Sequence, residues 1–117
     1  MSKVTDLISI ESIEQLFQDP LAVLLKHSIR CPISFSAKNE FDMFVSSCKQ
    51  ELSFYVVDVI AQRHVSNAIA EKCSIQHKSP QVLIFVNGTV VWNESHYAIT
   101  NEALHEAVDN AAGNVSG

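Results

Sequence analysis

The chain has 117 residues, of which 47% are apolar, and its formal net charge is −5. This length and composition suit one domain with its own apolar core, whereas the acidic balance disfavours nucleic acid or an anionic membrane as a partner. No apolar stretch reaches the roughly 20 residues of a membrane span, and acids interrupt the N-terminal region where a signal peptide is apolar. We therefore expect a soluble, cytoplasmic monomer whose cysteines stay reduced.

The first predicted elements are a short helix and a buried strand. Ser12 and Gln15 fit a capping box, which predicts a helix over Ile13–Phe17. The compact apolar run Leu21–Leu25 is typical of a strand that is buried on both faces.

A longer helix is predicted directly after Cys31, with Pro32 suited to its first position. Its apolar face is formed by residues at three- and four-residue steps, namely Ala37, Phe41, Phe44, Val45 and Cys48. Residues 52–60 then predict a second buried strand, rich in β-branched and aromatic side chains. Residues 63–73 predict a second helix, with Val65, Ala68 and Ile69 facing inward.

The last third of the chain predicts a hairpin and a final helix. Two apolar runs, 81–86 and 89–92, flank Asn87-Gly88, which is the strongest two-residue turn signal. Thr100 suits the N-cap of the final helix, whose inner side carries Ala103, Leu104, Ala107 and Val108. We expect one domain over residues 1–112 and a flexible tail over residues 113–117.

The predicted order is α-β-α-β-α-β-β-α. Strands separated by helices pair in parallel through right-handed crossovers, and the closing hairpin adds an antiparallel edge. The sequence thus predicts an α/β protein with a mixed four-stranded sheet. In such sheets the ligand site lies beyond the carboxyl ends of the parallel strands, and Cys31 follows a strand and precedes a helix at that place.

Cys31 is the main candidate for catalysis. A thiolate is the reactive form of cysteine, and a helix N-terminus favours it through unpaired N–H groups and a partial positive charge. We expect the N–H groups of Ile33 and Ser34 to point toward the sulfur, and the Ser34 hydroxyl to act as a further donor. Positive or polarisable side chains also precede the cysteine, at Lys26, His27 and Arg30. The alternative is that Cys31 is simply a small buried side chain.

Two motifs extend the site. Cys31-Pro-Ile-Ser34 follows a strand as the reactive motif of thioredoxin-like proteins does, with Ser34 in place of a second cysteine. Pro80 directly precedes the third buried strand, where thioredoxin-fold proteins carry a cis proline that faces the reactive thiol, so we expect a cis Ser79–Pro80 bond beside Cys31.

The stretches "KHSIRCPIS", "HKSPQVLIFV" and "SHYAIT", with their spacing, give the chain a specific resemblance over residues 21–104. It resembles the monothiol bacilliredoxins of the bacillithiol system, although Arg30 stands where that family usually has a small hydroxyl residue. The resemblance implies a thioredoxin-like three-layer α/β/α sandwich. It also implies a thiol-disulfide oxidoreductase that removes bacillithiol from mixed disulfides on client proteins. The implied partners are these S-bacillithiolated proteins and bacillithiol itself, as a co-substrate.

In this scheme Cys31 and Ser34 are the catalytic residues. Bacillithiol carries malate carboxylates, which a basic pocket can pair with. The residues expected to contact the substrate are Lys26, His27, Arg30, Pro32, Arg63, Ser79 and Pro80. We expect no bound cofactor and no metal, since the histidines and cysteines lack the spacing of zinc sites.

The other two cysteines receive different interpretations. Cys48 lies on the same predicted helix as Cys31, about 25 Å away at 1.5 Å per residue, and is expected in the core. Cys73 ends the second long helix, and a resolving role for it stays open. Two other functions also stay open: a non-catalytic module that binds an extended client strand beside Pro80, and a thiol peroxidase or arsenate reductase that uses the same cysteine.

Overall fold

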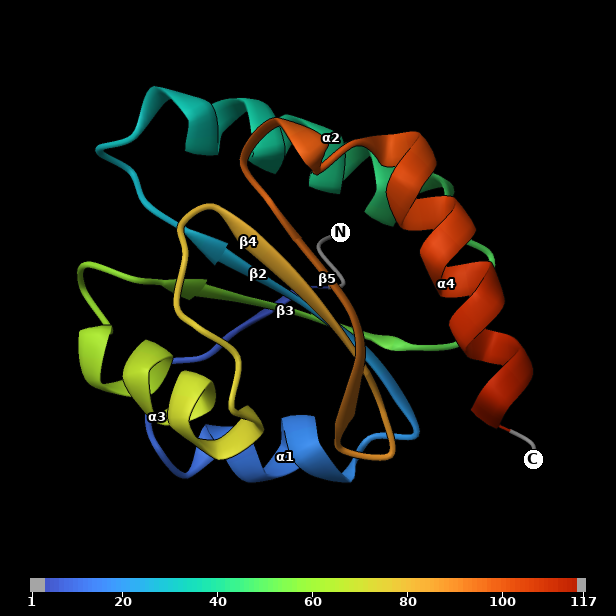
Figure 1. Ribbon diagram of the computed structural model, residues 1–117, viewed down its shortest axis with the longest axis horizontal. Coiled ribbons are helices and arrows are strands. Elements are labelled where there is room, and N and C mark those ends of the chain that lie inside the picture. The colour runs from blue at the N-terminus through green and yellow to red at the C-terminus, as the bar shows by residue number, and fades with distance from the viewer. Residues whose placement is uncertain (1–3, 116–117) are drawn as a thin grey trace.

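The computed structural model describes residues 4–115 and shows a five-stranded mixed sheet between two layers of helices (Figure 1). The strands are β1 (Val4–Asp6), β2 (Leu21–His27), β3 (Ser53–Asp58), β4 (Gln81–Val86) and β5 (Thr89–Ser95). The helices are α1 (Ser12–Gln18), α2 (Pro32–Ser47), α3 (Arg63–Cys73), the short 3₁₀ helix η1 (His96–Ala98) and α4 (Asn101–Val115). In the sheet the strands follow the order β1-β3-β2-β4-β5.

The sheet separates two apolar cores. Helices α2 and α4 cover one face and α1 and α3 the other (Figure 1). Because side chains alternate along a strand, β2 sends Leu21, Val23 and Leu25 toward α2 and α4, and Ala22 and Leu24 toward α1 and α3. The same alternation places Lys26 on the α3 side, and this position is important for the site.

The three-layer α/β/α sandwich is confirmed, but the prediction of four strands is wrong. Strand β1 pairs in parallel with β3 at the edge of the sheet. It has only three residues, and none of them is buried. Such a strand carries neither an apolar run nor an alternating pattern, so its pairing depends on the rest of the fold rather than on its own sequence.

Two boundaries also differ from the predictions. Ser12 is not the N-cap of α1: it is the first helical residue, and its hydroxyl donates to the carbonyl of Ser9. Gln15 bonds to Asp19 instead of completing a capping box. Helix α4 runs to Val115, so residues 113–115 are helical rather than part of a tail; residues 116–117 lie outside the described residues.

The hairpin turn and the start of α4 agree with the sequence analysis. Asn87 and Gly88 have φ values of 50° and 82°, as a tight turn with two left-handed residues requires. The N–H of Ala103 donates to the Thr100 hydroxyl at 3.1 Å, which caps α4. Among the described helices, none is long and apolar enough to cross a bilayer.

Candidate active site

Cys31 is the N-cap of α2 and lies just beyond the carboxyl end of β2. Its side chain is partly exposed, so the interpretation as a buried small residue does not hold. The backbone around it is fixed by two bonds: its N–H donates to the carbonyl of Ser28 at 3.3 Å, and its own carbonyl accepts from the N–H of Ser34 at 3.0 Å. The sulfur is thus held on a fixed backbone at the start of a 16-residue helix.

Ser34 does not have the contact that the sequence analysis expected. Its side chain is fully buried, and its Oγ accepts from the Ser28 N–H at 2.9 Å and lies 3.1 Å from Nδ1 of His27. The cap has no side-chain hydrogen bond, so neither Ser34 nor the first N–H groups of α2 donate to the sulfur here. Ser34 instead fixes the loop between β2 and Cys31, and its predicted role as a direct donor to the sulfur is corrected.

His27 ends β2 and faces the start of α2. Its ring packs edge-to-face on Phe35, with 5.8 Å between the ring centroids. Burial lowers the pKa of His27 below its ordinary value of 6.5, and the charge of Lys38 adds to this effect. His27 is therefore a mainly neutral side chain near neutral pH, suited to packing and hydrogen bonding rather than to attracting an anion.

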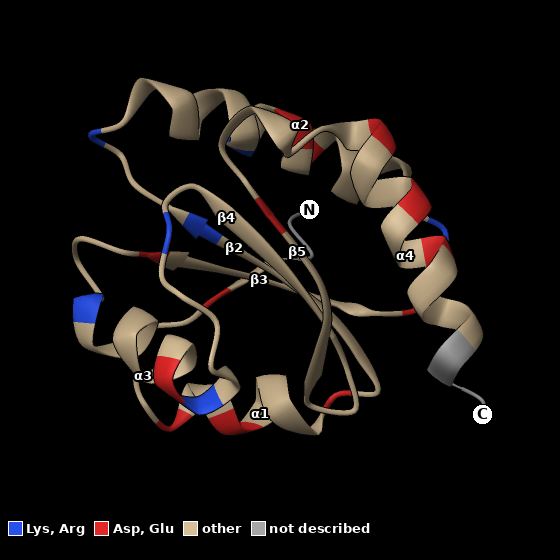
Figure 2. Ribbon diagram, viewed as in Figure 1, with Lys and Arg blue, Asp and Glu red and all other residues tan. Residues whose placement is uncertain are grey.

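Basic side chains do gather at this edge of the sheet, but not in the set that was expected. Arg30 lies in the loop before Cys31, Arg63 opens α3 and Lys78 precedes β4, in the part of the chain where Figure 2 shows basic positions at one end of the sheet. All three side chains are exposed. Lys78 was missed because it is distant from Cys31 in the sequence. Pro32, at the first position of α2, is also exposed beside the cysteine.

Lys26 is the exception, since it is fully buried. Its Nζ donates to the carbonyl of Ser66 at 3.3 Å and lies 3.3 Å from Nδ1 of His77. Loss of hydration lowers the pKa of Lys26 from 10.5 to about 8. The prediction that Lys26 contacts an anionic ligand is therefore wrong: the alternation of β2 turns this side chain under α3.

The Ser79–Pro80 peptide bond is cis. The carbonyl of Pro80 accepts from the N–H of His96 at 3.1 Å, which ties the end of β5 to the start of β4. Ser79 lies just before the β4 ladder, and within residues 4–115 its backbone N–H and carbonyl have no hydrogen-bond partner. Its Oγ is also buried without a partner there. Ser79 thus offers a free backbone donor and acceptor near the end of β2.

The other cysteines lie away from Cys31. Cys48 is the C-cap of α2 and belongs to the core on the α2 and α4 face, as predicted. The two ends of this helix are about 25 Å apart at 1.5 Å per residue. Cys73 ends α3 and packs on the opposite face of the sheet. Within the described residues, none of the three cysteines takes part in a disulfide.

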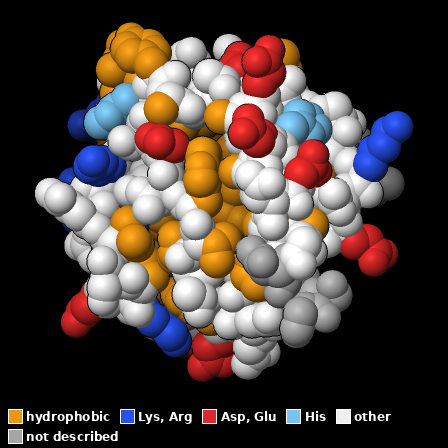
Figure 3. Space-filling view, turned by 45° about the vertical axis from the view of Figure 1, so that its right-hand side comes forward, with side chains coloured by type: hydrophobic (Ala, Val, Ile, Leu, Met, Phe, Trp, Pro, Cys, Tyr) orange, Lys and Arg blue, Asp and Glu red, His pale blue; other side chains and the backbone are white. Residues whose placement is uncertain are grey.

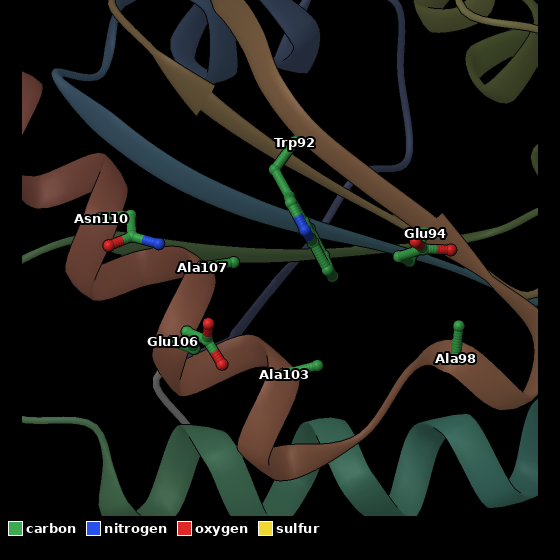
Figure 4. Close-up of a pocket in the computed structure, with 7 residues that line it drawn as sticks. All are labelled: Trp92, Glu94, Ala98, Ala103, Glu106, Ala107 and Asn110. Atoms are coloured by element: carbon green, nitrogen blue, oxygen red, sulfur yellow. The ribbon is translucent and has the colours of Figure 1, made fainter.

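A pocket of about 250 Å³ lies elsewhere, between β5 and α4 (Figure 4). Its apolar floor is visible in the middle of the face in Figure 3, with acidic side chains above it. Its lining residues are Trp92, Glu94, Ala98, Ala103, Glu106, Ala107 and Asn110. None of the residues predicted for the site is among them, so Cys31 and its neighbours lie at the edge of the sheet and not in this pocket.

The family model described as monothiol bacilliredoxin BrxC matches residues 2–104. The chain belongs to the monothiol bacilliredoxin family. It is similar to the solved structure of a candidate oxidoreductase with a thioredoxin fold, with 36% identity, a TM-score of 0.81, and coverage of 89% of this chain and 92% of that chain. This bacilliredoxin-family chain therefore has a thioredoxin fold and a thiol redox role.

More distant structures show the same fold. Thioredoxin from Trypanosoma brucei brucei is 15% identical, with a TM-score of 0.75 and coverage of 94% of this chain and 91% of that one. Thioredoxin from Malassezia sympodialis is 18% identical, with a TM-score of 0.71 and coverage of 93% and 90%. At these identities the likeness supports the thioredoxin fold of the bacilliredoxin chain and carries no further functional argument.

Proposed function

We propose that this protein removes bacillithiol from mixed disulfides on client proteins. The Cys31 thiolate attacks the bacillithiol sulfur, the client cysteine leaves as a thiolate and takes up a proton, and Cys31 carries the bacillithiol. A free bacillithiol thiolate then attacks the bacillithiol sulfur of this adduct. That step releases bacillithiol disulfide and restores the Cys31 thiolate, so the two sulfurs that become oxidised belong to bacillithiol.

The observation that carries the proposal is the isolation of a partly exposed thiol. Cys31 is fixed at the start of α2, whereas Cys48 is at the far end of that helix and Cys73 is on the other face of the sheet. A disulfide requires Cα atoms within about 7 Å, so the cap position of Cys48 excludes it as a partner of Cys31. This arrangement suits exchange with an external thiol.

The exposed cations at the edge of the sheet suit the malate carboxylates of bacillithiol. Arg30, Arg63 and Lys78 come from three different segments at the end of the sheet where β2 and β3 end and β4 begins (Figure 2). Arginine can bind a carboxylate with two parallel hydrogen bonds. We propose these three residues as the anion-binding set, in place of the set that included Lys26.

The backbone of Ser79 suits a client in extended conformation. Its free N–H and carbonyl can pair with one residue of a client strand, as strand-addition modes of recognition do. Pro80 follows without an N–H of its own, so it does not compete for the client carbonyl. The client disulfide would then be presented to Cys31 across the end of β2.

The test is the intact mass of the protein after incubation with bacillithiol disulfide. We expect one bacillithiol adduct, located on the peptide that contains Cys31, and its removal by added bacillithiol. A Cys31→Ser variant is the control. An unmodified Cys31 would support a binding module instead, and turnover of peroxide or arsenate without a mixed disulfide would support the other enzyme class.

A further inference from the structure

Residues 74–79, in the loop between α3 and β4, are held by two buried polar side chains that lie beneath them. Gln81 is nearly fully buried; its amide group donates to the carbonyl of Gln76 at 3.2 Å and accepts from the N–H of Lys78 at 3.4 Å. Lys26 reaches the same loop from β2 through His77. The register of β2 and β4 places Lys26 opposite Gln81, so both anchors lie side by side under the loop.

The contact between Lys26 and His77 has a defined direction. An ammonium group has only donors, so Nδ1 of His77 must be the acceptor and its ring must be neutral. Ser66 adds a second contact, with its Oγ 3.2 Å from the same nitrogen. A buried lysine is costly unless it is well bonded, and in the described residues Lys26 has no carboxylate partner.

We propose that Lys26 and His77 are positioning residues that hold the loop 74–79 so that the Ser79 backbone is presented to the client. The inference deepens the proposed function, since it concerns how a client docks beside Cys31. Neither residue touches the reacting sulfur atoms. Their contact instead fixes the segment that ends at Ser79, whose free N–H and carbonyl are the proposed client contacts.

The contact depends on pH through His77. His77 is exposed as a whole residue, but partial loss of hydration lowers its pKa below 6.5, and the charges of Lys26 on β2 and Arg63 on α3 lower it further. Ser66, also on α3, faces the same nitrogen without a charge. Above that pKa the neutral ring accepts from the Lys26 ammonium. Below it Nδ1 carries a proton that faces the ammonium, so the contact is lost and the loop keeps only its anchor at Gln81 on acidification.

The experiment uses a peptide whose cysteine is activated as a mixed disulfide with thionitrobenzoate, so that it does not require bacillithiol. Cys31 attacks the peptide sulfur and releases the coloured thionitrobenzoate, and alkylation by iodoacetamide measures the intrinsic reactivity of the same thiol. Lys26→Met and His77→Leu should lower the peptide rate about three- to tenfold, as expected for the net contribution of one typical hydrogen bond, with iodoacetamide alkylation unchanged. His77→Asn keeps an acceptor that does not titrate and should retain the wild-type peptide rate at pH 7.

Two further measurements separate positioning from a structural role. Between pH 7 and 5 the ratio of the wild-type peptide rate to that of His77→Asn should fall, because the ratio cancels the titration of Cys31. An NMR titration should show the pKa of His77 rising in Lys26→Met but not in Lys49→Met, an exposed lysine in the loop after α2. Thermal unfolding of each variant establishes that it is folded.

The inference is overturned if Lys26→Met leaves the His77 titration or the peptide rate unchanged, or if both probes slow equally. It is also overturned if the wild type shows no preference for the peptide over the small probe. Absence of a bacillithiol adduct in the mass experiment would instead refute the proposed substrate and leave the loop measurements valid.

Discussion

Among the described residues, Cys31 is the one cysteine that lies at this edge of the sheet, just beyond the carboxyl end of β2. Cys48 closes the far end of α2 and Cys73 closes α3 on the other face. A single thiol at a helix start is sufficient for one exchange step, and in the proposed cycle the second thiol comes from solution. Substitution of each cysteine should therefore have a different effect on exchange and on stability.

Cys31→Ser should abolish exchange with a bacillithiolated client, whereas Cys73→Ala should keep it. Cys48→Ala should also keep the chemistry and lower the free energy of unfolding by about 1 kcal/mol, as is typical of the loss of a small buried group. Client release followed by mass spectrometry, with denaturant unfolding alongside, checks both parts. A folded but inactive Cys48→Ala would contradict the placement of this residue in the core.

Tyr55 and Asp19 form a buried polar pair on the α1 and α3 face of the sheet. The Tyr55 hydroxyl donates to Asp19, whose other carboxylate oxygen accepts from Gln15 at 2.9 Å. Tyr55→Phe removes one bond from a nearly buried carboxylate and should lower the free energy of unfolding by about 1–2 kcal/mol. Equilibrium unfolding in urea at pH 7 measures it, and exchange at Cys31 should remain at the wild-type rate.

The helices and strands that could be predicted are those whose own residues carry a clear apolar or turn pattern. The apolar steps of α2, the buried runs of β2 and β4, and the Asn87-Gly88 turn each follow from their own residues. β1 could not be found, because its three residues gain their order only from pairing with β3. The same distinction applies to the site. Cys31 could be predicted because the strand before it and the helix after it have clear local patterns. The burial of Lys26 and Ser34 could not be predicted, because it depends on how α3 and the β2–α2 loop pack on the sheet.

The turn between β4 and β5 gives a test of how one residue limits the geometry of a structural element. Gly88 has a left-handed φ of 82°, and a Cβ there would lie 2.6 Å from the carbonyl oxygen of Phe17. Gly88→Ala should therefore destabilise the protein by about 1–3 kcal/mol, from the left-handed backbone and the displaced carbonyl. Gly113→Ala is the matched control, because nothing lies within 4 Å of its Cβ. Since Gly113 is within α4, the control should be neutral or slightly stabilising. Thermal unfolding of both variants decides it; an equal loss of stability in the two would contradict the steric explanation.

Two buried titratable groups, one on each of two adjacent strands, make the stability of the whole molecule depend on alkaline pH. The pKa of Lys26 is lowered to about 8 in the folded state, and burial together with the bond to Asp19 raises the pKa of Tyr55 to about 12. Between pH 8 and 10.5 the unfolded chain binds more protons at Lys26 than the folded chain, so this group makes stability rise with pH. From pH 10 to 12 the folded chain holds the Tyr55 proton that the unfolded chain has lost, so stability falls.

We therefore expect unfolding free energies that rise above pH 8 and fall again above pH 10. Lys26→Met should remove the rising part and Tyr55→Phe should weaken the fall. Urea unfolding at steps of pH from 7 to 11.5 measures both slopes. A wild-type profile that is flat from pH 8 to 10, or one that Lys26→Met leaves unchanged, would contradict the buried ammonium as its origin.

The separation of Cys31 from the other two thiols also has a quantitative consequence. A dithiol protein that closes its own disulfide equilibrates with the square of the concentration of the small thiol. In the proposed reaction Cys31 exchanges with one small disulfide and releases one small thiol, so the modified fraction of Cys31 depends on the simple ratio of the two concentrations. Dilution of the whole thiol pool at a constant ratio leaves that fraction unchanged. The fold thus links the state of Cys31 to the degree of oxidation of its surroundings and not to their total thiol content.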